Sequence, residues 1–143
     1  MATESILKPR SGHRAVRVGD DGTAWAEGYR CGDCGAVMLD ATMACRRCGS
    51  RNPLDTFRAA QTGKVFSWTV VHRSYPGIPV PFVSAIVDLD DGLTLKGTLR
   101  EVEPDDVGAG FPVRIVFDDA GGACDSEGGP YVGFHFEPQE VPQ

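Results

Sequence analysis

Residues 29–52 read YRCGDCGAVMLDATMACRRCGSRN and contain two Cys-x-x-Cys pairs separated by ten residues. The pairs are Cys31/Cys34 and Cys45/Cys48, and glycines beside them supply the backbone freedom that tight metal knuckles need. Four thiolates at this spacing suit a tetrahedral Zn²⁺ ion. Because the four sulfurs would fill every coordination position, the sequence predicts one structural zinc site and no catalytic metal.

Two other interpretations of the cysteine pairs are weaker. Disulfides are opposed by a cytoplasmic setting, where thiols stay reduced. A thioredoxin-like redox pair would need a βαβ context, which the sequence around the pairs does not offer. Spacing alone does not distinguish zinc from iron, and zinc is the expected ion.

Downstream of the cysteines the sequence turns to strands. Val outnumbers Leu by 15 to 7, as is typical of β proteins, because a branched Cβ packs well on a pleated surface. Alternation from Val65 to His72 predicts a two-faced strand, with Val65, Ser67 and Thr69 on one face. Five strands without βαβ alternation predict a five-stranded OB-fold barrel, and they are expected at 63–72, 82–89, 93–99, 113–117 and 131–136.

The expected organisation is an N-terminal arm, a zinc ribbon, a connector and the barrel, over residues 1–28, 29–52, 53–62 and 63–143. Within the arm we expect a short strand from Ala15 to Val18 and one helical turn from Thr23 to Glu27. Residues 101–112 are expected to form a short helix or a loop with Val102 and Val107 turned inward.

Charge and hydropathy exclude several classes of function. The 143 residues carry a net charge of −6, and residues 59–143 contain five Lys/Arg against thirteen Asp/Glu. Such a domain repels phosphate backbones, which disfavours nucleic-acid binding. No apolar run approaches the roughly 20 residues that cross a bilayer, and the first thirty residues lack a secretory h-region. We therefore expect a cytoplasmic protein that binds neither membranes nor nucleic acid.

The remaining side chains with chemical potential have ordinary structural explanations. Arg46, Arg47 and Arg51 are candidate contacts for an anionic ligand, although a solvent-exposed role in offsetting the negative charge of the metal site is the favoured explanation for each one singly. Cys124 is expected to be an ordinary exposed thiol, while His72 and His135 are expected at the rim or in the core. No nucleophile–base arrangement, phosphate loop or nucleotide fingerprint is present, so no catalytic residue is assigned.

In order along the chain, the stretches RCGDCGAV, CRRCGS, GKVFSWTVVHRS, PFVSAIVDLDDGLTLKGTL, VGAGFPVRIVFDD and FHFEP resemble the DUF35 family. The likeness covers about residues 29–138. It implies a rubredoxin-like zinc ribbon before the OB fold, and a noncatalytic accessory subunit of a thiolase-like acyl-CoA-processing complex. Within the family, the resemblance points toward the small subunits of benzoylsuccinyl-CoA thiolases, which act in aromatic compound degradation. Other members imply hydratase or aldolase complexes as the alternative. Many members begin with a longer helical segment, which the polar arm replaces here.

The loop at residues 73–81, together with the ribbon, is the candidate surface for the catalytic partner subunit. Its prolines limit the entropy that an exposed apolar loop loses on docking. The side chains expected to contact the partner are Tyr75, Ile78, Val80 and Phe82. A cap on the barrel is the competing interpretation of these residues, and a self-standing acyl-CoA carrier is a further candidate function.

Overall fold

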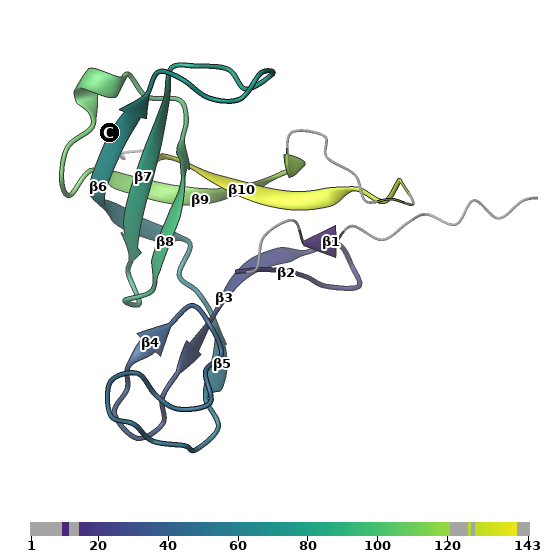
Figure 1. Ribbon diagram of the computed structural model, residues 1–143, viewed down its shortest axis with the longest axis vertical. Helices are drawn as coiled ribbons and strands as arrows, with labels where there is room; N and C mark the ends of the chain where they lie inside the picture. Colours follow the sequence, from purple (N-terminus) through teal and green to yellow (C-terminus); the bar gives the residue numbers. More distant parts are fainter. Residues whose placement is uncertain (1–9, 12–14, 121–125, 127, 140–143) are drawn as a thin grey trace, which may run out of the picture.

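The computed structural model describes residues 10–11, 15–120, 126 and 128–139. Strands dominate them, and a short 3-10 helix, η1, spans Pro104–Asp106. Figure 1 shows a barrel joined to a smaller unit, and the second sheet of the protein has four strands. The strands are β1 Arg10–Ser11, β2 Val16–Val18, β3 Ala24–Arg30, β4 Val37–Met38, β5 Asp55–Arg58, β6 Thr62–Val71, β7 Phe82–Leu89, β8 Thr94–Leu99, β9 Pro112–Asp118 and β10 Tyr131–Pro138.

Strands β6 to β10 close into the predicted five-stranded barrel. Antiparallel pairs join β6 to β7, β7 to β8 and β6 to β9. The last strand, β10, closes the ring, because it pairs antiparallel with β9 and parallel with β8 through Phe136 and Leu99. This order gives the OB-fold topology, and closure removes most of the strand edges that a Val-rich sheet would expose.

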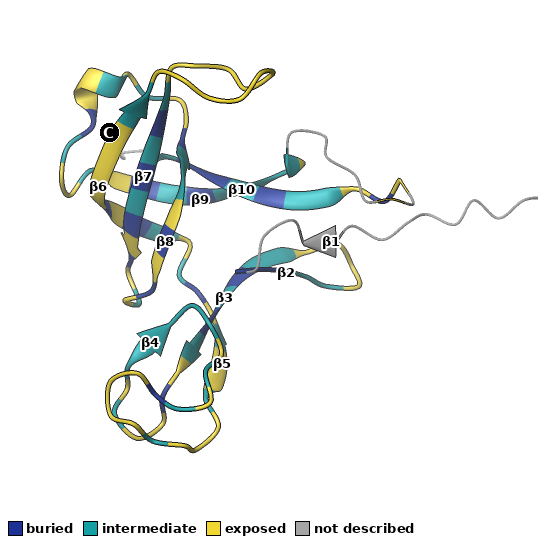
Figure 2. Ribbon diagram, in the orientation of Figure 1, coloured by how far each residue is buried: buried dark blue, intermediate teal, exposed yellow. Residues whose placement is uncertain are grey.

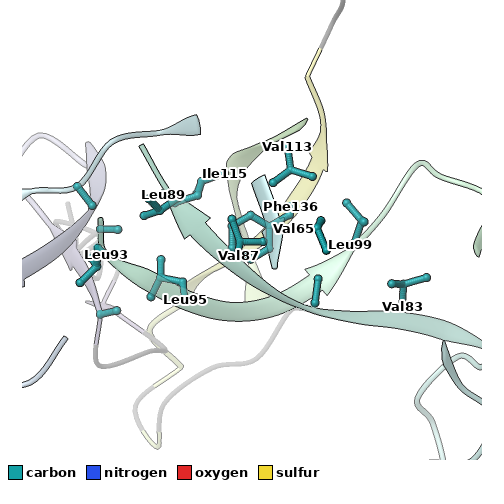
Figure 3. Packing of buried hydrophobic residues seen from close by; sticks show 14 of the residues in the cluster. Val65, Val83, Val87, Leu89, Leu93, Leu95, Leu99, Val113, Ile115 and Phe136 are labelled. Atoms are coloured by element: carbon teal, nitrogen blue, oxygen red, sulfur yellow. The ribbon is translucent and has the colours of Figure 1, made fainter. Parts of the chain in front are cut away.

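The barrel core is built from the inward-facing residues of all five strands. Val65, Val87 and Phe136 are fully buried and meet at its centre (Figures 2 and 3). Gly97 makes room for the aromatic rings, because a Cβ at this position would lie 2.9 Å from both Phe134 and Phe136. The predicted inward position of Val107 is confirmed, since this residue is buried beside η1 and belongs to the same cluster.

The simple alternation predicted for the first barrel strand is wrong beyond Val65. A β-bulge lies between Val65 and Ser67, so Phe66 has no partner on β7 and is 67% exposed. After the bulge, Trp68 and Val70 lie opposite Ala85 and Val83, on the face that Val65 occupies before it. One extra residue therefore inverts the pattern, as a bulge does.

The helical turn predicted from Thr23 to Glu27 is also wrong, because β3 runs through these residues. Long-range pairing overrides the weak local preference: β3 pairs with β2, β4 and β5. Ala26 and Gly28 are buried on one face of β3. Arg58 lies 4.1 Å from the ring centroid of Trp25. β3 runs across the predicted boundary between the arm and the ribbon at residues 28 and 29, and β5 lies within the predicted connector at residues 53–62. The predicted domain boundaries stay a prediction.

Within the described part of the chain, no helix has the length and apolarity that a membrane crossing requires. Cys124 and most of the first fourteen residues lie outside the described residues, so the predictions made for them stay predictions.

Candidate metal centre

Two similar turns present the four cysteines. The N–H of Gly35 donates to the carbonyl of Cys31, and the N–H of Gly49 donates to the carbonyl of Cys45, both at 2.9 Å. Both glycines have φ near +76°, a left-handed conformation that side chains disfavour. The sequence forms these two knuckles locally, because each turn places the second cysteine of its pair beside the first.

Tertiary pairing then brings the two knuckles together. The Sγ atoms of Cys31 and Cys48 are 3.7 Å apart, those of Cys34 and Cys45 are 3.6 Å apart, and all four lie within 4.8 Å of one another. A tetrahedron of sulfurs at ~2.3 Å from a central zinc has edges of about 3.8 Å. The four predicted ligands thus form one metal site whose donor set and dimensions fit a tetrathiolate centre.

The thiols are electrostatically unequal. Backbone N–H groups of Cys48 and Arg47 stabilise the thiolate of Cys45 and lower its pKa to about 6. The hydrogen bond from the N–H of Ser50 favours the thiolate of Cys48, but desolvation and the three neighbouring thiols outweigh it and raise the pKa of Cys48 to about 12. One thiolate therefore forms readily and a second is resisted, which is the expected behaviour of sulfurs crowded around a position suited to a cation.

A carboxylate ties the first knuckle to the second. Asp33 accepts hydrogen bonds from the hydroxyl of Ser50 and, at 2.8 Å, from Nδ2 of Asn52. These two bonds lower the pKa of Asp33, with Ser50 the larger cause. No local sequence pattern indicates these two hydrogen bonds, because Ser50 and Asn52 lie 17 and 19 residues from Asp33.

The base of the ribbon packs directly on the barrel. Gly28 is buried, and a Cβ there would lie 2.8 Å from the ring of Phe57 and 3.1 Å from Leu93 of the barrel. The guanidinium of Arg30 lies over the ring of Phe57, 4.6 Å from its centroid. The two units therefore share a continuous apolar contact, to which Leu39 also contributes.

A cleft of about 760 Å³ opens where the ribbon meets the barrel. Arg46 and Arg47 line it, whereas Arg51 does not. The structure thus brings two of the three candidate arginines to one cavity. The other lining residues come from the ribbon and from the β7–β8 turn: Gly35, Ala36, Val37, Met38, Leu39, Gly92, Leu93 and Thr94.

The candidate docking loop lies at the far end of the barrel, between β6 and β7 (Figure 1). Tyr75 is 81% exposed, and Ile78 and Val80 are each nearly half exposed. Ile78 and Phe82 border a second cavity of about 540 Å³, together with Pro79, Pro81, Thr98, Leu99, Arg100 and Glu101. Apolar side chains on this loop are therefore available on the surface of the isolated chain.

A polar network on the outside of the barrel was not anticipated. His135, at 6% exposure, lies between two carboxylates: Nδ1 is 2.7 Å from Asp118 and Nε2 is 2.6 Å from Glu137. Arg114 donates to Glu137 at 3.0 Å, directly across the β9–β10 pair. The register of β9 and β10 brings these four groups together. The expectation of a rim or core histidine agrees with the burial of His135 but did not include its partners. His72, by contrast, is exposed.

Comparisons with known proteins agree with this architecture. A family model described as the C-terminal OB-fold domain of ChsH2 matches residues 58–118. A chain in a solved structure described as the "Ltp2-ChsH2(DUF35) aldolase" superposes with a TM-score of 0.65 and 31% identity, over 80% of this chain and 84% of that one. The chain belongs to the DUF35 family.

DUF35 relatives carry several functional names. A "DUF35 domain-containing scaffold protein" of Methanocaldococcus jannaschii is 30% identical over 63% of this chain. The BbsA subunit of benzoylsuccinyl-CoA thiolase from Geobacter metallireducens is 31% identical over 57% of it. A 3-oxo-4,17-pregnadiene-20-carboxyl-CoA hydratase alpha subunit of Mycobacterium tuberculosis is 40% identical over 47%. This DUF35 chain spans 65%, 54% and 22% of those three proteins, respectively.

Proposed function

We propose that this chain is a noncatalytic zinc-ribbon/OB-fold subunit of a hetero-oligomeric complex that processes acyl-CoA thioesters, with a thiolase-like enzyme as its catalytic partner. The proposal draws on relatives that are named as subunits of thiolase, hydratase and aldolase assemblies. The observation that carries it is the cleft at the ribbon–barrel junction, which joins two arginines to an apolar wall. A CoA thioester combines anionic phosphates with a less polar arm, and this lining offers a match for both.

Zinc is the metal that we assign to Cys31, Cys34, Cys45 and Cys48. When bound, it would hold the two knuckles together, and four protein ligands would leave it no position for substrate. The four cysteines supply the soft donors, and Asp33 braces the turns that present them. The proposal includes a cytoplasmic location, where these thiols remain reduced.

Metal analysis of the purified chain tests the zinc assignment. We expect about one zinc per chain and four alkylatable cysteines after chelation at this site. A preparation with well under one zinc per chain and disulfides detected by mass would refute the assignment. Iron in place of zinc would refute only the identity of the ion.

The arginines of the cleft are proposed to contact CoA phosphates. In the complex with its catalytic partner, replacing both Arg46 and Arg47 by Ala should raise KM for the acyl-CoA at least about a hundredfold, because charge-assisted hydrogen bonds contribute about 1.5–3 kcal/mol each. Arg51→Ala is the matched control, since Arg51 does not line the cleft. Equal effects of Arg51→Ala and of the double variant would remove the cleft from the proposal.

The partner surface is proposed to include Tyr75, Ile78, Val80 and Phe82. Co-expression with the enzymes encoded beside the gene identifies the partner, and size-exclusion chromatography then compares wild type with Tyr75→Ser/Ile78→Ser. We expect the double variant to lose the complex while retaining its fold by circular dichroism. An unchanged complex would mean that the loop only caps the barrel.

A hydratase or an aldolase is the second candidate partner, which the names of other DUF35 relatives favour. The co-purified enzyme discriminates between them. The reaction that it catalyses identifies the class of the partner enzyme. Thiolysis of a 3-oxoacyl-CoA indicates a thiolase, hydration of an enoyl-CoA a hydratase, and retro-aldol cleavage of a hydroxyacyl-CoA an aldolase. Turnover of any of these by the isolated, metal-replete chain would refute the noncatalytic assignment.

A further inference from the structure

The C-terminal half of β6, residues 66–71, has one edge that no described strand pairs with. Along one side β6 pairs with β7 as far as Val71, but along its other side it pairs with β9 only from Thr62 to Lys64. Backbone bonds from Val65 to Gly110 and Phe111 extend that side by one residue. For residues 66–71, the described part of the chain provides no backbone partner other than β7, and η1 makes no backbone hydrogen bond to β6. In an antiparallel ladder alternate residues direct both N–H and C=O away from the neighbouring strand, so this edge carries free donors and acceptors.

Two large aromatic side chains along the edge are exposed. Phe66 is 67% exposed, and Trp68 remains 38% exposed although it lies opposite the fully buried Ala85. An inward-facing Trp that stays partly exposed indicates that no described segment covers the barrel beside this part of β6. The sequence from 66 to 71, FSWTVV, contains no charge and no proline, the two devices that commonly protect an edge strand.

Cations flank the edge. Lys64 precedes it and Arg73 follows it, and both are exposed. Asp88 lies opposite Lys64 on β7, but its carboxylate accepts a hydrogen bond from the hydroxyl of Thr94. An antiparallel pair of two β6 edges centred on residues 68 and 69 would set Lys64 of one copy against Arg73 of the other, twice over. Like charges directly opposite destabilise a strand pair, which argues against a second copy of this chain.

We propose that the edge of β6 at residues 66–71 accepts an extended strand from a different protein, with apolar or Thr side chains along its middle and carboxylates at its ends. The strand would gain main-chain hydrogen bonds from the free edge, contact with Phe66 and Trp68, and ion pairs with Lys64 and Arg73. This surface adjoins the docking loop at Arg73 and lies apart from the cleft at the ribbon, and the inference does not depend on acyl-CoA chemistry.

Synthetic peptides test the inference on the metal-replete full chain. The probe is a ten-residue peptide that alternates Thr and Val between Glu residues at both ends. Its first control has Lys at both ends, and its second is N-methylated at alternate residues, which blocks the backbone bonds. We expect the Glu peptide to bind at least tenfold more tightly than the Lys peptide, the methylated peptide not to bind, and amide hydrogen exchange to slow at residues 66–71.

Charge reversal on the protein provides the decisive comparison. Lys64→Glu/Arg73→Glu should invert the preference between the two peptides, whereas Arg51→Glu, an exposed position in the ribbon, should leave it unchanged. Binding without protection of residues 66–71, or equal binding of all peptides, would overturn the proposal. Concentration-dependent protection of this edge with no peptide present, together with a dimer in sedimentation, would also overturn it, because a second copy would then be the occupant.

Discussion

Gly63 offers a sharp test of how the barrel is packed. This residue lies where β6 pairs with β7 and β9 at once, opposite Leu89 on one side and Val113 on the other. A Cβ at position 63 would lie 2.8 Å from the Cα of Leu89 and still closer to the carbonyl oxygen of Asp88. Both obstacles are backbone atoms in a paired strand, so neither can rotate away. Gly63→Ala therefore requires the strands to separate locally.

The expected cost is about 1–3 kcal/mol, the usual range for overpacking a well-packed core. In urea, with a denaturant slope of about 2 kcal/mol/M, this lowers the unfolding midpoint by roughly 0.5–1.5 M. The control is Gly108→Ala, because nothing lies within 4 Å of a Cβ at that position. Reduced freedom of the unfolded chain should make the control neutral or stabilising by up to about 1 kcal/mol.

The assay is equilibrium unfolding followed by near-ultraviolet circular dichroism, with the metal site loaded in all three proteins. The reasoning fails if Gly63→Ala unfolds at the same urea concentration as Gly108→Ala. It also fails if the alanine variant is destabilised but the amides of β6, β7 and β9 keep their exchange rates, since the strain would then lie elsewhere.

Three further predictions concern the metal centre. Cys45→Ser should abolish metal binding and speed hydrogen exchange across residues 31–52 while β6 to β10 stay protected, and simultaneous loss of protection in the barrel would contradict this. Asp33→Ala should release metal to a chelator several-fold faster at pH 7 than Asp105→Ala does. Because the pKa of Asp33 is lowered on folding, its hydrogen bonds stabilise the knuckles above about pH 4 and are lost as the pH falls. The release rates of the two variants should therefore become equal in acid. In metal-free protein, iodoacetamide should modify Cys45 before Cys48 at pH 7, since their pKa values are about 6 and about 12, and mass spectrometry should show the rate of Cys45 labelling falling as the pH is lowered below 6. Equal labelling of the two cysteines at pH 7 would show that the backbone N–H groups do not stabilise the thiolate.

The spacing of the cysteines was sufficient to predict the metal ligands. A Cys-x-x-Cys turn followed by glycine is a local structure, closed by hydrogen bonds between residues four apart, such as Gly35 to Cys31. The strands of the barrel were predictable for a similar reason, because alternation and the Asp-Gly turn before Leu93 act over a few residues. These signals depend on a few neighbouring residues and therefore do not require knowledge of the tertiary structure.

Other features required the tertiary structure. The bulge at Phe66 reverses which side chains enter the core, and it follows from how β6 must bend to pair with both β7 and β9. β3 is a strand because it gains partners from β2, β4 and β5, which no local preference from Thr23 to Glu27 could indicate.

The arrangement of charged groups was likewise decided at long range. Arg46 and Arg47 reach a cleft, and Arg51 does not, only because the ribbon packs against Leu93. Asp118, His135 and Glu137 meet only through the register of β9 and β10. Turn chemistry and periodicity are properties of short segments, whereas clefts, open edges and polar networks arise from the packing of segments that are distant in the chain.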